Sequence, residues 1–170
     1  MLEIFNTLQP FFEDNYRRIN VREYARLRKI SAPTASKILA NLKNEGILKE
    51  EEDRQFRYYF ANKDSALLVE LSRIYWRLNL KKSGLLELLN KAFLSPVIIL
   101  FGSMSKAEVK QGSDMDLAMF TPTKKEIKVE KYEKLLKRKI QIFIFPSIAD
   151  VKNKELLNNI LNGQGISGSF

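Results

Sequence analysis

One stretch in the second half of the chain constrains its fold more than any other. Residues 98–101 form an apolar run that predicts a buried strand, and the following Gly102-Ser103 predicts a tight turn. After a polar loop, a second apolar strand carries Asp114 and Asp116 two residues apart. Because side chains alternate along a strand, both carboxylates should point to the same face of the sheet.

A pair of carboxylates on one face needs a cation to offset the repulsion between the two charges. Mg²⁺ fits this role, since it is bound by one or two carboxylates together with substrate phosphates. Gly102 would let the backbone approach a ligand closely, and the Ser103 hydroxyl with nearby N–H groups can hold a phosphate. The alternative is a polar loop followed by an ordinary amphipathic strand.

This pattern resembles the nucleotidyltransferase signature of the DNA polymerase β superfamily, an apolar strand, Gly-Ser, a spacer and then Asp-x-Asp between apolar residues. It is closest to the minimal nucleotidyltransferases of archaea and bacteria, and the resemblance covers residues 95–160. The resemblance implies that Asp114 and Asp116 are the catalytic residues and the metal ligands. It further implies nucleotide-binding roles for Gly102, Ser103 and Ser113, with Mg²⁺ and a nucleoside triphosphate as cofactor and substrate.

One position departs from the family pattern. The third metal carboxylate of the family lies on a neighbouring strand, which residues 139–145 predict here, and Gln141 stands at its position. A glutamine side chain carries no charge and cannot act as a base. Two-metal phosphoryl chemistry needs negative charge to hold both ions and a base to activate the attacking hydroxyl. The sequence leaves open whether the site transfers a nucleotidyl group to a hydroxyl or only binds a nucleotide. The carboxylates that could substitute are Glu108, Glu130 and Glu133.

The chain is basic and lacks two residue types that carry much enzyme chemistry. Lys and Arg number 29 against 20 Asp and Glu, which gives a formal net charge of +9 at pH 7. This balance favours polyanionic partners. The absence of cysteine and histidine excludes disulfides, thiol nucleophiles, zinc fingers and Ser-His-Asp catalysis. With no apolar run of membrane-spanning length and no signal peptide, we expect a cytoplasmic protein without a membrane partner.

The first third of the chain predicts three helices and a hairpin. Apolar spacing predicts helices over residues 2–18 and 21–29, and a third helix begins after a cap at Ser31 or Ala32 and stops at Gly46. Strands are predicted over residues 47–49 and 56–60, with four consecutive acids, residues 50–53, at the tip between them.

This order of elements resembles the winged-helix domains of small prokaryotic transcription regulators, in which the second helix of the helix-turn-helix enters the major groove. The resemblance implies a set of DNA contacts from that helix and from the wing: Thr34, Ser36, Lys37, Asn41, Lys43, Arg54 and Arg57. The acidic tip opposes phosphate contact. Either the wing stays off the DNA, or the module binds a protein.

The remaining chain predicts helices over residues 64–80 and 85–93, a basic helix over residues 124–139 and a last helix over residues 147–160. Residues 162–170 predict a frayed tail.

We therefore expect an α+β protein: a winged helix-turn-helix domain over residues 1–62, connecting helices over 63–94, and a polymerase-β-like nucleotidyltransferase domain over 95–170 with a mixed sheet and flanking helices. Proteins of this arrangement resemble mostly archaeal predicted regulators. We expect a homodimeric DNA-binding regulator that also binds Mg²⁺ and a nucleoside triphosphate. The alternative is an antitoxin-like or scaffold protein whose degenerate nucleotidyltransferase fold binds a protein partner.

Overall fold

The computed structural model describes residues 3–93, 95–123 and 125–169. The chain divides into two compact units. The N-terminal unit is Met1–Leu71 with Ala107–Gln111, and the C-terminal unit is Ser72–Lys106 with Gly112–Phe170. None of the helices in the described ranges is both long enough and apolar enough to cross a membrane.

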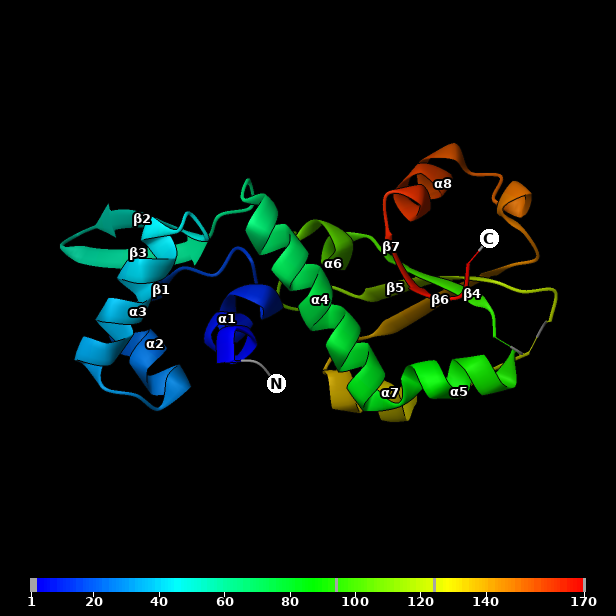
Figure 1. The fold of residues 1–170 in the computed structure, drawn as a ribbon, viewed down its shortest axis with the longest axis horizontal. Helices are drawn as coiled ribbons and strands as arrows, with labels where there is room; N and C mark the ends of the chain where they lie inside the picture. The colour runs from blue at the N-terminus through cyan, green and yellow to red at the C-terminus, as the bar shows by residue number, and fades with distance from the viewer. Residues whose placement is uncertain (1–2, 94, 124, 170) are drawn as a thin grey trace. The chain divides into compact units, whose positions relative to one another are not determined.

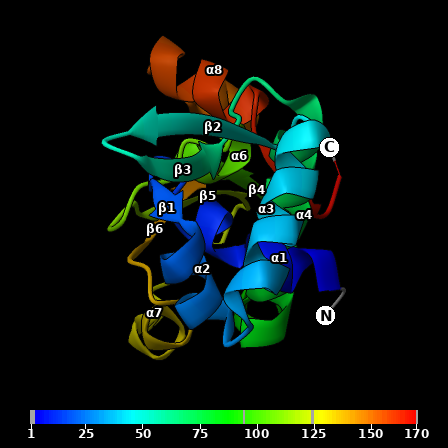
Figure 2. The same ribbon diagram turned by 90° about the vertical axis from the view of Figure 1, so that its left-hand side faces the viewer.

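The N-terminal unit combines three helices with a small antiparallel sheet (Figure 1). Its elements in chain order are α1 (Glu3–Glu13), β1 (Ile19–Asn20), α2 (Val21–Arg28), α3 (Ala32–Asn44), β2 (Leu48–Asp53) and β3 (Phe56–Ala61). The strand order is β1-β3-β2. Figure 2 shows α2 and α3 side by side with the β2–β3 hairpin beyond them.

Local capping explains why α2 and α3 begin where they do. The Asn20 side chain accepts a hydrogen bond from Glu23 N at 2.9 Å, and the Ser31 hydroxyl accepts one from Thr34 N at 3.2 Å. Between the helices, Lys29 adopts the left-handed conformation with φ +54°. The predictions of a helix over residues 21–29 and of a cap at Ser31 are therefore confirmed.

The first predicted helix is too long at its C-terminal end. It was expected over residues 2–18, of which residue 2 lies outside the described residues, but α1 ends at Glu13. Asp14 Oδ1 accepts a hydrogen bond from Tyr16 N at 3.0 Å and Asn15 Nδ2 donates to Phe11 O at 2.8 Å. These bonds turn the chain out of the helix.

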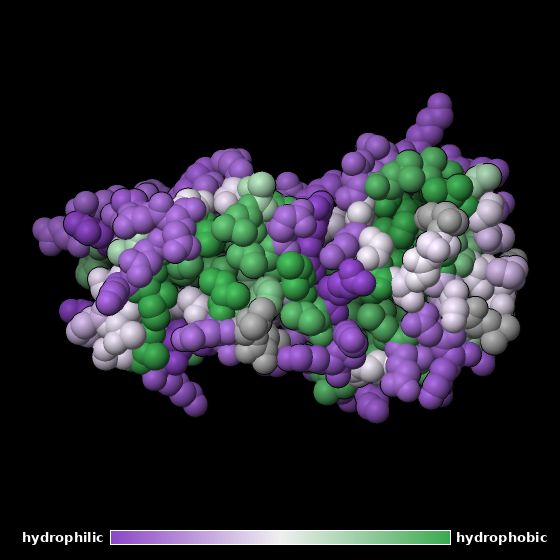
Figure 3. Space-filling model, viewed as in Figure 1, coloured by the Kyte–Doolittle hydropathy of each residue, from purple (hydrophilic) through white to green (hydrophobic). Residues whose placement is uncertain are grey.

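The hairpin differs from the prediction in the position of its acids. All six residues of β2 pair with β3, so the four acids lie on a strand, and the tip is Arg54-Gln55. Both tip residues have positive φ, 46° and 71°, as a two-residue turn that matches the twist of the strands requires. In Figure 3 hydrophilic side chains cover the hairpin.

The C-terminal unit is built on a mixed four-stranded sheet of order β6-β5-β4-β7 (Figure 1). Its elements are α5 (Leu85–Ala92), β4 (Val97–Phe101), α6 (Ser103–Lys106), β5 (Met115–Phe120), α7 (Glu130–Leu136), β6 (Ile140–Phe145), η1 (Ile148–Asp150), α8 (Lys154–Leu161) and β7 (Gln164–Ser167). Strand β4 is antiparallel to β5 and β7, whereas β5 and β6 are parallel. Helix α4 (Ala66–Ser83) continues from the N-terminal unit into this one.

At the central strands β4 and β5, both faces of the sheet are buried. On one face Ile99, Phe101, Ala118 and Phe120 pack with residues of η1 and α8. On the other face the alternate residues of β4 and β5 are buried as well: Ile98, Leu100, Leu117 and Met119. Burial on both faces explains why the two strands are almost continuously apolar.

Two predicted helices are shorter than expected. Of the predicted helix over residues 124–139, whose first residue lies outside the described ones, only α7 forms, and the predicted helix over 147–160 is divided into η1 and α8. Ser147 and Asp150 form a capping box that closes the short turn η1, and Asn153 caps α8 separately. The helix expected over residues 64–80 continues to Ser83 and ends before Gly84.

The predicted frayed tail over residues 162–170 contains a four-residue strand. Residues 164–167 form β7 and pair with β4, while residue 170 lies outside the described residues. A Cβ on Gly163 would lie 2.7 Å from Leu100 O, and one on Gly168 would lie 2.8 Å from Pro96 O. These glycines therefore permit a close approach of two backbones rather than a flexible end.

Candidate functional site: a carboxylate pair at a strand end

The Gly-Ser turn and the Asp-x-Asp strand meet at one end of the sheet. Phe101, the last residue of β4, pairs with Asp116 of β5. Gly102 follows with φ +72°, and a Cβ built on it would lie 2.5 Å from Asp116 Oδ2. Glycine suits this position for two reasons: it adopts the backbone conformation readily, and it leaves the space that the Asp116 carboxylate occupies.

Asp114, Asp116 and Gln141 form one polar group at the start of the parallel strands β5 and β6. Gln141 is the register partner of Asp116, and its Nε2 donates a hydrogen bond to Asp114 Oδ2. The position that the family resemblance gives to a third carboxylate is thus occupied by an amide that supports one carboxylate through a donor but adds no charge.

The two carboxylates influence each other electrostatically. Burial raises the pKa of Asp116, and the negative charge of Asp114 raises it further. Asp116 is half-buried at the end of the apolar face that continues through Ala118 and Phe120. The site therefore holds more negative charge than its surroundings stabilise, a condition that a bound cation relieves.

The serines predicted to bind nucleotide occupy the two loops of the motif. Ser103 is the first residue of α6 and is partly exposed, and Ser113 directly precedes Asp114. Lys106 ends α6, three residues after Ser103, and donates a hydrogen bond to Asn159 Oδ1 of α8 at 2.9 Å.

A basic pocket adjoins Ser113. Its volume is about 610 Å³. Its lining combines four cations with two carboxylates and two small residues: Lys134, Lys137, Arg138, Lys139, Glu130, Glu133, Gly112 and Ser113. The Glu133 carboxylate is engaged, since it accepts from Ile140 N at 3.1 Å and pairs with Lys139 at 3.2 Å. The pocket wall is therefore net positive, and it reaches Ser113, the residue before Asp114 in the chain.

The carboxylates considered as substitutes for the third ligand do not complete a cluster. Within residues 3–93, 95–123 and 125–169, no group of three or more Asp, Glu, His or Cys side chains is arranged to hold a metal ion. Glu133 is engaged as described, and Glu108 belongs to the segment that packs in the N-terminal unit. The site thus offers two carboxylates and Gln141.

The residues predicted to contact DNA all lie in the N-terminal unit. Five are exposed on α3, and two are exposed on the hairpin: Thr34, Ser36, Lys37, Asn41, Lys43, Arg54 and Arg57. The acids of β2 are largely engaged by arginines: Arg18 lies 3.4 Å from Glu51 and 3.8 Å from Asp53, and Arg57 lies 3.8 Å from Glu50.

A comparison with protein families agrees with the C-terminal geometry. Residues 85–166, slightly less than half of the chain, match the family described as polymerase beta, nucleotidyltransferase. The match supports a nucleotidyltransferase domain over these residues, and the mixed four-stranded sheet is consistent with that fold. No curated protein and no solved structure matches the chain significantly.

Proposed function

We propose that the C-terminal unit binds Mg²⁺ with a nucleoside triphosphate, with Asp114 and Asp116 as metal ligands and Gly102, Ser103 and Ser113 at the phosphates. The contact between Gly102 and Asp116 carries the proposal. Because a Cβ at Gly102 would lie 2.5 Å from Asp116 Oδ2, the Gly-Ser backbone and the carboxylate face the same small space. A phosphate bound by the turn would therefore lie beside the carboxylate that holds its cation.

The residues present fit a divalent cation. Oxygen ligands are the ones Mg²⁺ prefers, and the raised pKa of Asp116 indicates a carboxylate without a compensating positive charge. Bound there, the ion would neutralise phosphate charge and polarise the phosphoryl group. The basic pocket beside Ser113 supports a ligand with more than one anionic group.

The corresponding reaction is nucleotidyl transfer to a hydroxyl. The hydroxyl oxygen would form a bond to the α-phosphorus, the bond from that phosphorus to the bridging oxygen would break, and pyrophosphate would leave. The hydroxyl proton needs an acceptor, and the Gln141 amide cannot serve as one. We therefore propose nucleotide binding as the primary function, with Gln141 limiting transfer.

A calorimetric titration tests the binding proposal. Wild-type protein is titrated with each of the four ribonucleoside triphosphates, with Mg²⁺ and with EDTA, beside Asp114→Asn and Asp116→Asn. We expect Mg²⁺-dependent binding that both variants lose. Absence of binding to the wild type would contradict the proposal and favour the alternative of an antitoxin-like scaffold that binds a protein.

Restoring a carboxylate at position 141 tests the limit on transfer. Gln141→Asp places a negative charge beside Asp116, and we expect it to increase the incorporation of label from an α-labelled nucleotide into an acceptor. Gln55→Asp, at the exposed hairpin turn, adds the same charge elsewhere as a control. Equal activity of wild type and both variants would show that Gln141 does not limit the reaction.

We further propose that the N-terminal unit is a winged helix that binds DNA, in keeping with a regulator. The observation that favours this function is the exposed polar face of α3, which Thr34, Lys37 and Asn41 share. The acids of the hairpin do not oppose phosphate contact at its tip. They lie along β2 and mostly face arginines, whereas the tip presents Arg54. Pairing of two copies on half-sites one helical turn apart is the expected assembly.

Salt dependence tests this second proposal. Fluorescence anisotropy of labelled duplex DNA is measured at several salt concentrations for wild type, Lys37→Ala and Lys82→Ala. Loss of one phosphate contact should reduce the slope of log K against log salt by about 0.9. We expect that reduction for Lys37→Ala but not for Lys82→Ala, which removes an exposed charge on α4. Equal slopes in all three proteins would exclude α3 as the contact surface.

A further inference from the structure

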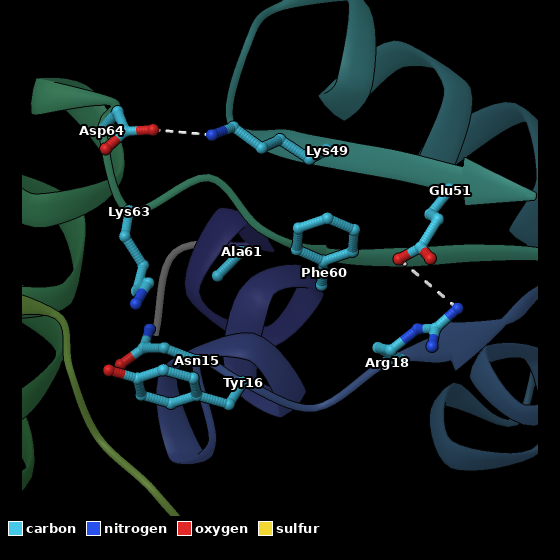
Figure 4. Close-up of a pocket in the computed structure, with 9 residues that line it drawn as sticks. All are labelled: Asn15, Tyr16, Arg18, Lys49, Glu51, Phe60, Ala61, Lys63 and Asp64. Atoms are coloured by element: carbon cyan, nitrogen blue, oxygen red, sulfur yellow. Dashed lines mark hydrogen bonds and ion pairs between the residues drawn. The ribbon is translucent and has the colours of Figure 1, made fainter.

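The N-terminal unit contains a small pocket that neither proposed function uses. Its volume is about 270 Å³. It is lined by residues from the loop after α1, from the hairpin and from the turn before α4: Asn15, Tyr16, Arg18, Lys49, Glu51, Phe60, Ala61, Lys63 and Asp64 (Figure 4). None of these residues is among the nucleotide or DNA contacts named above.

The centre of the pocket is apolar. Figure 4 shows the Phe60 ring between Lys49 and Glu51 on one side and Asn15 and Tyr16 on the other. Phe60 is half-buried, and Tyr16 is 44% exposed. Two aromatic side chains on a pocket wall provide contact area for a flat apolar ligand.

The charges around the pocket leave one cation outside the ion pairs. Lys49 pairs with Asp64 at 2.6 Å, and Arg18 pairs with Glu51 at 3.4 Å. Within the described part of the chain, the ion pairs do not include Lys63, whose Nζ lies 4.0 Å from the centre of the Tyr16 ring. The lining therefore carries three cations against two carboxylates, with the excess charge beside an aromatic ring.

We propose that this pocket binds a small aromatic carboxylate, with its ring on Phe60 and Tyr16 and its anionic group on Lys63. The small volume favours a ligand of one or two rings, because most ligand sites occupy about 300–1,000 Å³. The Lys63 charge beside the Tyr16 ring, in a lining with one more cation than carboxylates, favours an anion over a neutral or cationic ring.

The same wall holds a segment that leads to the carboxylate pair. Asn15 N donates to Val109 O at 2.8 Å, Val109 N donates to Asn15 Oδ1 at 2.7 Å, and Lys110 Nζ lies 5.0 Å from the centre of the Tyr16 ring. Residues 107–111 belong to this unit by their packing, yet they connect Ser103 to Asp114 along the chain. A ligand on the Tyr16 ring would therefore lie next to this segment.

The test uses the full chain and three related probes: naphthoate, the neutral naphthamide and the cationic naphthylmethylamine. Binding is followed by saturation-transfer NMR and calorimetry. We expect naphthoate to bind at least about tenfold more tightly than the amide, and the amine not to bind. Absence of naphthoate binding, or equal binding of all three probes, would overturn the proposal.

Variants locate the site. Lys63 is exposed, so Lys63→Met should fold normally and bind naphthoate no better than naphthamide, whereas Lys63→Arg should keep the preference. Lys82→Met, on α4, removes one exposed charge elsewhere and should behave as wild type. Equal weakening by Lys63→Met and Lys82→Met would indicate general charge attraction and overturn the proposal.

Hydrogen exchange gives an independent readout that needs no nucleotide. Naphthoate should slow amide exchange in peptides covering residues 14–18 and 107–111, and it should leave those of α8 unchanged. Unchanged exchange in residues 14–18 at saturating naphthoate would place the ligand elsewhere and overturn the proposed site.

Discussion

At the scale of single residues, the candidate site depends on the contact between Gly102 and Asp116. The backbone at Gly102 is left-handed, with φ +72°, and the Asp116 carboxylate fills the space that a side chain would need. Asp116 in turn is half-buried and repelled by Asp114. Glycine adopts this backbone conformation readily, whereas the Asp116 carboxylate is held where both burial and the neighbouring charge oppose its ionisation.

Gly102→Ala should lower stability and abolish Mg²⁺–nucleotide binding. The left-handed backbone costs about 1 kcal/mol for alanine, and displacing the carboxylate raises the total to about 2–4 kcal/mol. Gly84→Ala is the matched control, since Gly84 has φ +80° with nothing within 4 Å of its Cβ, and it should cost only about 1 kcal/mol. Urea unfolding compares the two, and equal losses would show that the contact with Asp116 is unimportant.

Asp116→Asn should stabilise the metal-free protein at neutral pH. Because the folded state raises the pKa of Asp116, its ionisation favours the unfolded chain, and stability is lost as pH rises through the raised pKa. The advantage of the variant should therefore disappear below the ordinary carboxyl pKa of about 3.9. Thermal unfolding at neutral and acidic pH measures this difference.

Asp64→Asn provides a control at a carboxyl group whose pKa is shifted in the opposite direction. The hydrogen bond and charge of Lys49 lower the pKa of Asp64, so that carboxylate contributes stability above its unfolded pKa and loses it as pH falls. Asp64→Asn should therefore be no more stable than wild type at pH 7. A gain for Asp64→Asn, or a loss for Asp116→Asn, would contradict these assignments.

At the scale of elements, the glycine-rich C-terminal residues, which were expected to be frayed, include the strand β7. The strand forms the edge of the sheet beside β4, with a register irregularity between Ile98 and Ile99. Gly163 enters the strand where a side chain would meet Ile99, Leu100 O and Ile160 O, all within 2.9 Å. The glycine allows the chain to pass from α8 into the sheet.

Gly163→Ala should destabilise the C-terminal unit by about 1–3 kcal/mol, because two of the three contacts are with backbone oxygens that cannot move aside. Gly165→Ala is the matched control within the same segment, since nothing lies within 4 Å of its Cβ, and its effect should stay within about 0.5 kcal/mol. Chemical unfolding of both variants checks this. Similar effects at the two positions would mean that β7 does not pack as described.

At the scale of the whole molecule, one short segment lies between two segments of the C-terminal unit in the chain but packs in the N-terminal unit. Residues 107–111 connect the Gly-Ser turn to the strand with Asp114 and Asp116 but pack with the N-terminal unit. Val109 and Asn15 are both almost fully buried there, joined by two hydrogen bonds. The motif loop is therefore tied to residues almost one hundred positions earlier in the chain.

Asn15→Ala should release this loop. Val109 N and Phe11 O would lose their side-chain partners, and each unsatisfied buried group costs about 1–3 kcal/mol. We expect the unfolding free energy to fall by about 2–4 kcal/mol and amide exchange at Val109 to accelerate. Asn44→Ala, at the exposed end of α3, should have little effect on either. Unchanged exchange at Val109 in Asn15→Ala would show that the loop is held by other contacts.

The predictions from sequence succeeded where the determining interactions are local. The helices from Val21 and after Ser31 follow from capping residues and apolar spacing, and the strands around Gly102 follow from apolar runs and a turn residue. The predictions failed at residues 14–18 and at the hairpin tip, where short-range turns replaced the expected elements. They also failed at the C-terminal tail, where the outcome depends on pairing with the distant strand β4.

By itself, the sequence determined that Asp114 and Asp116 lie on one face beside a Gly-Ser turn, because the period of a strand and the freedom of glycine at φ +72° are properties of the local chain. Only the tertiary structure decided that Gln141 Nε2 donates to Asp114, that residues 164–167 complete the sheet and that Val109 packs against Asn15. Strand register and loop packing join residues far apart in the chain, and local periodicity carries no information about those partners.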